Sequence, residues 1–192
     1  AETNDEKIIS YKSATQNPAD GYGSDWHPSA ITQQNSAYVL ADKICQAIGI
    51  ESDQVGLDVA ADAIYDVEIN KENGANAAFY VGYDKTFWIN MVSGGASAQD
   101  IIAILSGISL KKDGEYHLEF DYITTHDKDI TVSLKGNSIY FTDTINPSSE
   151  KKHYSKTFIV SADDSDSKLT FDIGNGNSYN VTLSNIKLTK IA

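Results

Sequence analysis

Apolar and polar side chains alternate without a break along Glu115-Tyr-His-Leu-Glu-Phe-Asp-Tyr122. A period of two places every apolar side chain of such a segment on one face of a β-strand. Further segments toward the C-terminus repeat the pattern between polar turns, namely 129–135, 156–160, 168–173 and 179–188. Several short alternating segments at regular spacing predict an all-β fold, an antiparallel β-sandwich of the jelly-roll type.

The same pattern extends upstream as far as Ala77. Residues 78–83 and 86–92 are expected to be strands joined by a tight turn at Asp84-Lys85, and Asn73-Gly74 is a good hairpin turn. Residues 100–105 carry no polar side after Asp100, so both faces of that strand should be covered. The β-sandwich is therefore expected to occupy residues 61–192.

Residues 1–60 differ in character and form an N-terminal elaboration of the same single module. Residues 1–35 are polar and rich in turn signals, whereas 36–48 are predicted to be helical. Asn35 or Ser36 could cap this helix and Gly49 could end it. Its apolar stripe is expected to pack in a core rather than bind a partner; the stripe comprises Ala37, Leu40, Ala41, Ile44 and Ile48.

Residues 51–70 allow two interpretations. The alanines at 60, 61 and 63 could continue a helix, while 64–69 alternates like a strand. The sequence alone does not choose between them.

Composition limits the classes of partner. The chain has 192 residues, enough for one domain with one core, and a formal net charge of −12. This acidic balance argues against nucleic acid and anionic membranes as partners, and it fits a neutral ligand. No apolar run approaches the roughly 20 residues that span a bilayer. Cys45 is alone, which excludes an internal disulfide and a thiolate zinc site.

From about Thr86 to Ile191, the order of these segments resembles the carbohydrate-binding modules of the family 4, 9 and 22 group. The resemblance rests on an ordered series of strand motifs. They are Gly114-Glu-Tyr-His-Leu-Glu-Phe120, Ile130-Thr-Val-Ser-Leu134, Phe158-Ile-Val160, Leu169-Thr-Phe-Asp-Ile-Gly174 and Val181-Thr-Leu-Ser-Asn-Ile-Lys-Leu188. Such modules are β-sandwich jelly rolls attached to secreted bacterial glycanases.

The resemblance implies a non-catalytic module that binds a polysaccharide and forms part of a larger, multimodular protein. It also implies a secreted or cell-surface location in a bacterium. Because the chain starts at Ala1 rather than Met, we expect that a targeting peptide has been removed or left out. No cofactor is expected, although modules of this group often hold a structural calcium ion.

One departure from the family concerns the buried strand, which in the family commonly carries glutamines facing a sugar-binding cleft. The matching positions here are Ile102 and Leu105. The usual β-glucan or xylan cleft is therefore in doubt, and the helix at 36–48 could cover that face instead. We expect a glucan, with a slight preference for an α-glucan such as starch over β-glucan or xylan.

Aromatic residues are the leading candidates for ligand binding, because sugar rings stack on flat aromatic faces while amides bind their hydroxyls. Trp26 lies in a turn-rich segment, and Trp88 lies between Phe87 and Ile89, so it should point outward together with Asn90. The remaining candidates are Tyr80, Tyr83 and, at a loop edge, Tyr140. The alternative is that these rings pack beneath residues 1–35.

Catalytic chemistry finds little support. Glu119 and Asp121 share one strand face, as glycosidase carboxylates would, but Thr124 stands where a third acid belongs, and a solvated face is the simpler interpretation. The four histidines are not at metal-ligand spacing, and no nucleophile-elbow or phosphate-loop motif occurs. Asp163-Asp-Ser-Asp166 offers oxygens to calcium but lacks the glycine and the distal glutamate of an EF-hand.

Two rival functions remain open. The first is a structural or cell-surface interaction domain with the same fold and no sugar site, and the second is a glycoside hydrolase or lyase. Fold alone does not decide among them, because sandwiches host many functions. Accessible tryptophan rings would favour sugar binding, and a third acid converging on Glu119 and Asp121 would favour an enzyme.

Overall fold

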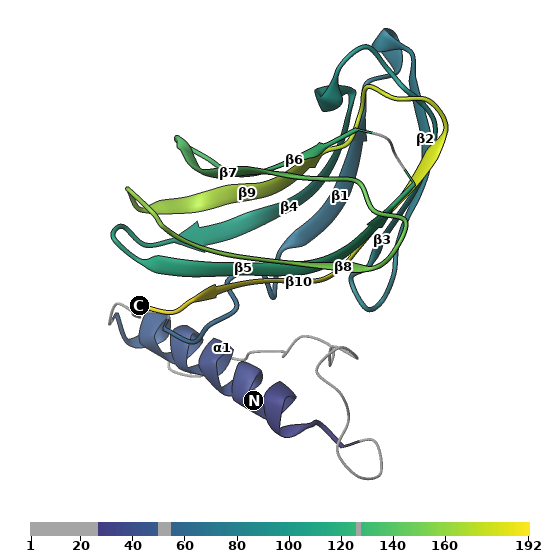
Figure 1. Ribbon diagram of the computed structural model, residues 1–192. Coiled ribbons are helices and arrows are strands. Elements are labelled where there is room, and N and C mark those ends of the chain that lie inside the picture. The colour runs from purple at the N-terminus through teal and green to yellow at the C-terminus, as the bar shows by residue number, and fades with distance from the viewer. Residues whose placement is uncertain (1–26, 50–54, 126–127) are drawn as a thin grey trace, which may run out of the picture. The chain divides into compact units, whose positions relative to one another are not determined.

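The computed structural model describes residues 27–49, 55–125 and 128–192, which belong to two compact units, residues 1–57 and 58–192 (Figure 1). The described part of the first unit contains one helix, α1 (Ala30–Ile48). The second unit consists mainly of β-strands. No helix in the described ranges is long and apolar enough to cross a membrane.

Helix α1 begins six residues earlier than the sequence predicted. The side chain of Ser29, rather than Asn35 or Ser36, caps it by accepting a hydrogen bond from the backbone of Thr32 at 3.1 Å. Gly49 ends the helix with a left-handed φ of 73°, as predicted. The apolar stripe was expected in a core, but Leu40, Ile44 and Ile48 are exposed. That prediction was wrong.

The second unit is a sandwich of two antiparallel five-stranded sheets (Figure 1). We call β1-β4-β9-β6-β7 sheet I and β2-β3-β10-β5-β8 sheet II. The strands are β1 (Ile64–Ile69), β2 (Ala75–Val81), β3 (Phe87–Gly94), β4 (Ile101–Leu110), β5 (Glu115–Thr124), β6 (Ile130–Lys135), β7 (Ile139–Ile145), β8 (Lys152–Ile159), β9 (Asp164–Asp172) and β10 (Tyr179–Lys190). The predicted β-sandwich is thereby confirmed.

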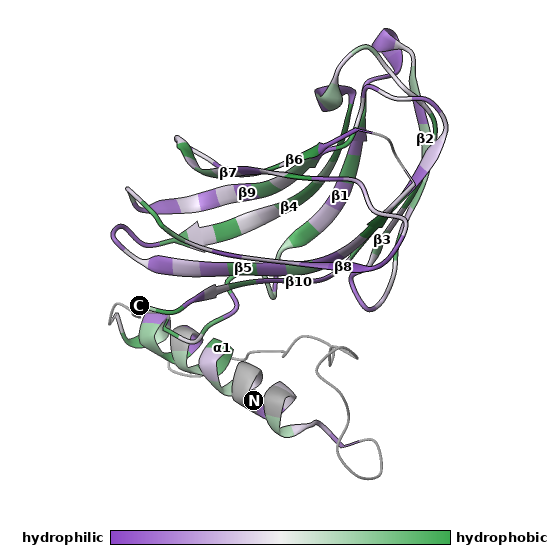
Figure 2. Ribbon diagram, in the orientation of Figure 1, coloured by the Kyte–Doolittle hydropathy of each residue, from purple (hydrophilic) through white to green (hydrophobic). Residues whose placement is uncertain are grey.

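The core lies between the sheets and follows from the alternation along the strands, which Figure 2 displays as alternating hydropathy. Along β5, Tyr116, Leu118 and Phe120 are fully buried. Phe120 stacks on Tyr154 with 4.6 Å between ring centroids and meets Phe171 of the opposite sheet edge-on at 5.1 Å. Aromatic contacts of this kind join the two sheets in one core.

Both sheets curve in the same direction, and sheet I lies on the inside of the curve (Figure 1). The face of sheet I that points away from the core is therefore concave, and side chains on a concave face crowd one another. Ile104, Ser133, Thr170 and Asp172 point away from the core by register yet are almost entirely buried. The prediction that both faces of the 100–105 strand are covered is therefore confirmed, with crowding on the outer face.

The ambiguous segment before Ile69 forms two different structures. Residues 64–69 form β1, and Asp58 bridges Thr189 of β10 beyond the point where β3 stops pairing. The carboxylate of Asp58 accepts hydrogen bonds from the backbone of Leu188 at 3.0 Å and of Ala60 at 3.1 Å. The segment thus continues the hydrogen bonding of sheet II along the second half of β10.

Asp100 anchors the start of β4. Its side chain accepts hydrogen bonds from Asn70 and Asn73, between β1 and β2, and from the backbone of Ala96 and Ser97. These bonds lower the pKa of Asp100, the largest contribution coming from Asn73. The predicted hairpin at Asn73-Gly74 was wrong, because β1 and β2 belong to different sheets and a 3-10 turn (Lys71–Asn73) connects them.

Candidate functional site

Exposed aromatic rings in the described ranges gather on one hairpin, β2–β3. They are Phe79 (44% exposed), Tyr80 (58%), Tyr83 (98%) and Trp88 (54%). Tyr80 and Trp88 point outward from sheet II, while the inward-pointing neighbours of Trp88 on β3, Phe87 and Ile89, are buried. The predicted outward orientation of Trp88 is confirmed.

The strand register places the candidate residues side by side. Trp88 pairs with Tyr80 of β2 on one side and with Thr182 of β10 on the other. Asn90 lies two residues along β3, on the same face, and pairs with Asn180 of β10. Directly opposite residues have Cβ atoms about 5 Å apart. Two rings bordered by two amides therefore form a continuous surface, which we call the aromatic shelf (Tyr80, Trp88, Asn90, Thr182 and Asn180).

The turn between β2 and β3 holds the shelf in place. The backbone N–H of Gly82 donates to the carbonyl of Thr86 at 2.9 Å, and that of Lys85 donates to the carbonyl of Gly82 at 3.0 Å. Lys85 adopts a φ of 60° in this turn. The Tyr80 ring lies against Gly82, where a Cβ atom would come within 3.7 Å of it. The turn is thus closed by hydrogen bonds at the base of the two rings.

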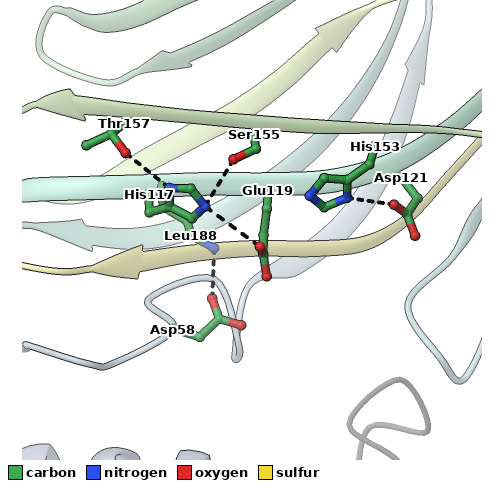
Figure 3. A network of polar contacts seen from close by, with 8 residues as sticks. All are labelled: Asp58, His117, Glu119, Asp121, His153, Ser155, Thr157 and Leu188. Carbon is green, nitrogen blue, oxygen red and sulfur yellow. Dashed lines mark hydrogen bonds and ion pairs between the residues drawn. The ribbon is translucent and has the colours of Figure 1, made fainter.

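A polar cluster continues the same outer face across β10, β5 and β8 (Figure 3). His117 Nδ1 lies 3.1 Å from the hydroxyl of Thr157, and its Nε2 lies 3.3 Å from the hydroxyl of Ser155 and 3.7 Å from Glu119. The two histidines of this face, His117 and His153, are 36 residues apart in the chain and were not brought together by the sequence analysis. Only the pairing of β5 with β8 shows that they share a surface.

Asp121 is the centre of the second half of this cluster. It contacts His153 at 2.8 Å, Lys151 at 2.8 Å and the amide of Asn185, which donates at 2.7 Å. Desolvation raises its pKa, but the hydrogen bonds from Lys151, His153 and Asn185 outweigh it and lower the pKa to about 2. The carboxylate is therefore ionised and occupied by protein donors.

The acids considered for glycosidase chemistry take other roles here. Glu119 and Asp121 share the outer face as predicted, but their neighbours are His117, His153 and Lys151 rather than Lys135, which lies in sheet I. Thr124 points inward and is buried, so no acid could join them from that position. The arrangement thus shows two acids in separate contacts with basic side chains.

Three sequence candidates lie away from the shelf or outside the described residues. Tyr83 is in the turn, because β2 ends at Val81, and its ring is almost fully exposed. Tyr140 belongs to β7 of sheet I, a strand the sequence analysis missed, and its hydroxyl donates to Asp164 at 2.8 Å. Trp26 lies outside the described residues.

The acidic segment 163–166 accepts hydrogen bonds from the protein. Asp164 accepts from the backbone of Asn137 and Asp166 and from Tyr140, and these bonds lower its pKa, with Asn137 contributing most. Asp163 accepts from the backbone of Lys112. Within the described ranges, no group of three or more His, Cys, Asp or Glu side chains is placed to hold a metal ion. A structural calcium ion stays a prediction.

The outer face of sheet I holds the position where the family carries cleft glutamines. Ile102 points outward there, but Leu105 has the opposite parity and is buried in the core, so the second half of that assignment was wrong. Next to Ile102, Asp172 accepts a hydrogen bond from the side chain of Gln99 at 2.9 Å. Exposed aromatic side chains are absent from the described strands of this sheet.

Comparison with known proteins gives a family and a fold. The sequence model of the carbohydrate binding domain CBM_4_9 matches residues 69–180. A solved CBM4 structure has a TM-score of 0.60 at 18% identity, covering 66% of this chain and 86% of its own. The N-terminal cellulose-binding domain of Cellulomonas fimi β-1,4-glucanase C has a TM-score of 0.54 at 14% identity, covering 66% and 88%.

The CBM1 module of BiXyn10A is similar to the same degree, with a TM-score of 0.54, 15% identity, and 71% of this chain and 99% of that chain covered. No curated protein matches the chain. At these identities the solved structures show the fold, and the family match comes from the sequence.

Proposed function

Because the chain belongs to the CBM_4_9 family of carbohydrate-binding domains, we propose that it is a non-catalytic module that binds a glucan on the aromatic shelf of sheet II. Trp88 and Tyr80 stack on sugar rings, and Asn90 and Asn180 bind the hydroxyls at the edge of the rings. Starch-type α-glucan is the first polymer to test, followed by β-glucan and xylan.

The observation that carries this proposal is the position of the exposed rings. All of the exposed aromatic side chains in the described ranges lie on β2–β3, and two of them are cross-strand neighbours beside asparagines. Soluble proteins rarely gather exposed apolar side chains in one patch without a binding role. A flat aromatic surface bordered by amides is chemically suited to a saccharide.

The expected affinity is modest. Each ring stack contributes about 0.5–1.5 kcal/mol beyond the burial of its area. An open surface with two rings should therefore bind an oligosaccharide with micromolar or weaker affinity. A module of this strength suits an exported bacterial protein whose further modules act on the same polymer, and the glucanase that carries a similar domain supports this placement.

Affinity gel electrophoresis with starch, cellulose, xylan and mannan tests the proposal. We expect the wild type to be retarded by at least one polymer and Trp88→Ala to lose that retardation, while Trp88→Phe keeps part of it. The matched control is Thr144→Ala, an exposed position on the outer face of sheet I, which should bind like the wild type. Circular dichroism should show all three variants folded, because Trp88 and Thr144 are both exposed.

Two outcomes contradict the proposal. Equal retardation of wild type and Trp88→Ala would remove the shelf as the site, and Trp26→Ala in the same gels then tests the remaining tryptophan. A wild type that no polymer retards would favour an interaction domain without a sugar site.

A further inference from the structure

The sandwich has four edge strands, and they differ in charge. In the order of the two sheets, β1 and β7 bound sheet I while β2 and β8 bound sheet II. Charged side chains occur on β1 (Asp66, Glu68), β7 (Asp143) and β8 (Lys152, Lys156), but Ala75-Asn-Ala-Ala-Phe-Tyr-Val81 of β2 has none. Charges on edge strands oppose pairing with another chain, so β2 lacks the usual protection.

Among the described strands β2 pairs only with β3, and on its other side the N–H of Ala75, at the start of the strand, donates to the carbonyl of Asn70 at 3.2 Å. Gly82 is hydrogen-bonded to Thr86, and in an antiparallel pair alternate residues face the partner strand. Tyr80 and Ala78 therefore bond to β3, whereas Val81, Phe79 and Ala77 direct their N–H and C=O groups outward. The bulge in this pair places the extra residue, Val92, on β3, so β2 itself continues unbroken.

We propose that β2 pairs antiparallel with β2 of a second copy of this chain, about a two-fold axis at Ala78. The new pairs are then Ala78 with Ala78, Ala77 with Phe79, and Asn76 with Tyr80, and each large side chain meets a small or amide side chain across the strands. The partly exposed Phe79 ring is covered by the alanine of the other copy.

Self-pairing suits this strand better than it suits the other three. A two-fold axis brings each residue near its own copy, so a charged edge strand meets like charges, whereas β2 meets none. The resulting ten-stranded sheet carries two aromatic shelves on one outer face. Two linked sites bind a polymer more strongly than one, because the second contact becomes intramolecular.

The net charge of −12 per chain sets the conditions for pairing. Two such chains repel each other at low ionic strength, and salt screens this repulsion, with a Debye length of about 10 Å at 0.1 M and about 3 Å at 1 M. The dimer fraction should therefore rise with NaCl concentration.

Sedimentation velocity of the full chain, without any sugar, tests the proposal. Ala78→Lys and Ala78→Glu should each raise the dimer dissociation constant at least tenfold, because residue 78 meets itself at the axis. An equimolar mixture of the two variants should restore the dimer through a lysine–glutamate pair. Ala77→Pro, which removes an outward N–H without removing a bond to β3, should also weaken it. Ile64→Lys, at an exposed position of β1, is the matched control and should not.

Three results would overturn this interface. A wild type that stays monomeric at high salt and high concentration excludes it, and slow hydrogen exchange of the Phe79 amide in that monomer would assign the edge to another segment of the same chain. A dimer insensitive to both Ala78 substitutions places the contact elsewhere. A mixture that fails to restore the dimer refutes the register. Because no sugar is used, none of these results bears on the proposed glucan binding.

Discussion

The outer faces of sheets I and II are built by the same strand alternation and yet present different chemistry. The face of sheet II exposes Trp88 and Tyr80. The face of sheet I carries hydroxyls, acids and isoleucines, and Ile104 and Thr170 are almost completely buried although they point away from the core. The outward face of sheet I is concave and that of sheet II is convex, which accounts for the difference in exposure (Figure 1).

On the inside of the curve, side chains lean toward one another and lose contact with water, so outward residues contribute to stability. On the outside they spread apart, and large rings stay accessible. The comparison therefore predicts that substitutions on sheet I act mainly on folding and that substitutions on the aromatic shelf act mainly on ligand binding. The Trp88→Ala test addresses the second half of this statement, and the following variant addresses the first.

Ile104→Ala should produce the largest change in stability. Its buried side chain leaves a cavity on the inner curve, and we expect a loss of about 2–4 kcal/mol in the free energy of unfolding. Urea titration measures this loss, and gel retardation of the folded variant should match that of the wild type. Loss of retardation at nearly unchanged stability would instead assign the ligand site to sheet I.

Asp58→Asn should remove a pH-dependent penalty from sheet II. Burial raises the pKa of Asp58 from 3.8 to about 6, although bonds from the backbone of Leu188 and Ala60 act against the shift. A raised pKa in the folded state means that stability is present below pH 4 and is lost as the pH rises through about 6. The asparagine oxygen can still accept both bonds.

We therefore expect Asp58→Asn to gain about 1–3 kcal/mol at pH 7 and to change little at pH 4, with the partial exposure of this residue placing the gain in the lower part of that range. Thermal unfolding at the two pH values measures the effect. An equal change at both would show that the carboxyl does not titrate in this window.

Asp121→Asn should have a smaller effect of the opposite sign. The pKa of Asp121 is lowered from 3.8 to about 2, so its stabilisation is present above pH 4 and is lost as the pH falls toward 2. The exposed partners Lys151 and His153 are screened by water, which limits the contribution to about 0.5–1 kcal/mol. The variant should be less stable than the wild type at pH 6 and nearly equal to it at pH 2. Undiminished stability at pH 6 in low salt would show that the cluster contributes nothing.

Local patterns were sufficient to predict most of the strands, because each of these segments shows a two-residue period independently of the rest of the chain. The predictions failed where the structure depends on tertiary contacts rather than on the local pattern. β7 (Ile139–Ile145) was missed because polar and apolar residues do not alternate cleanly along it, and pairing with β6 forms it nonetheless. Asn73-Gly74 has the residues of a hairpin turn, but Asn73 donates a hydrogen bond to Asp100, 27 residues away, in a connection between two different sheets.

Part of the candidate site could be predicted from the sequence in the same way. Parity along β3 was enough to predict that Trp88 and Asn90 point outward together. The neighbourhood of Tyr80 and Trp88, and the separation of Tyr140 on another sheet, required the strand pairing. The contact of His117 with Ser155 left no signal in the sequence, because these two residues meet only across β5 and β8 (Figure 3).

The amino-acid sequence alone determined that the second part of the chain forms a β-sandwich, which residues of the clearly alternating strands face its core, and that the chain resembles a carbohydrate-binding family. Only the tertiary structure decided which outward residues are accessible, which rings are neighbours and which strands are left at an edge. The physical reason is that alternation is a property of one strand, whereas exposure and neighbourhood depend on sheet order, register and curvature, which contacts between distant segments set together.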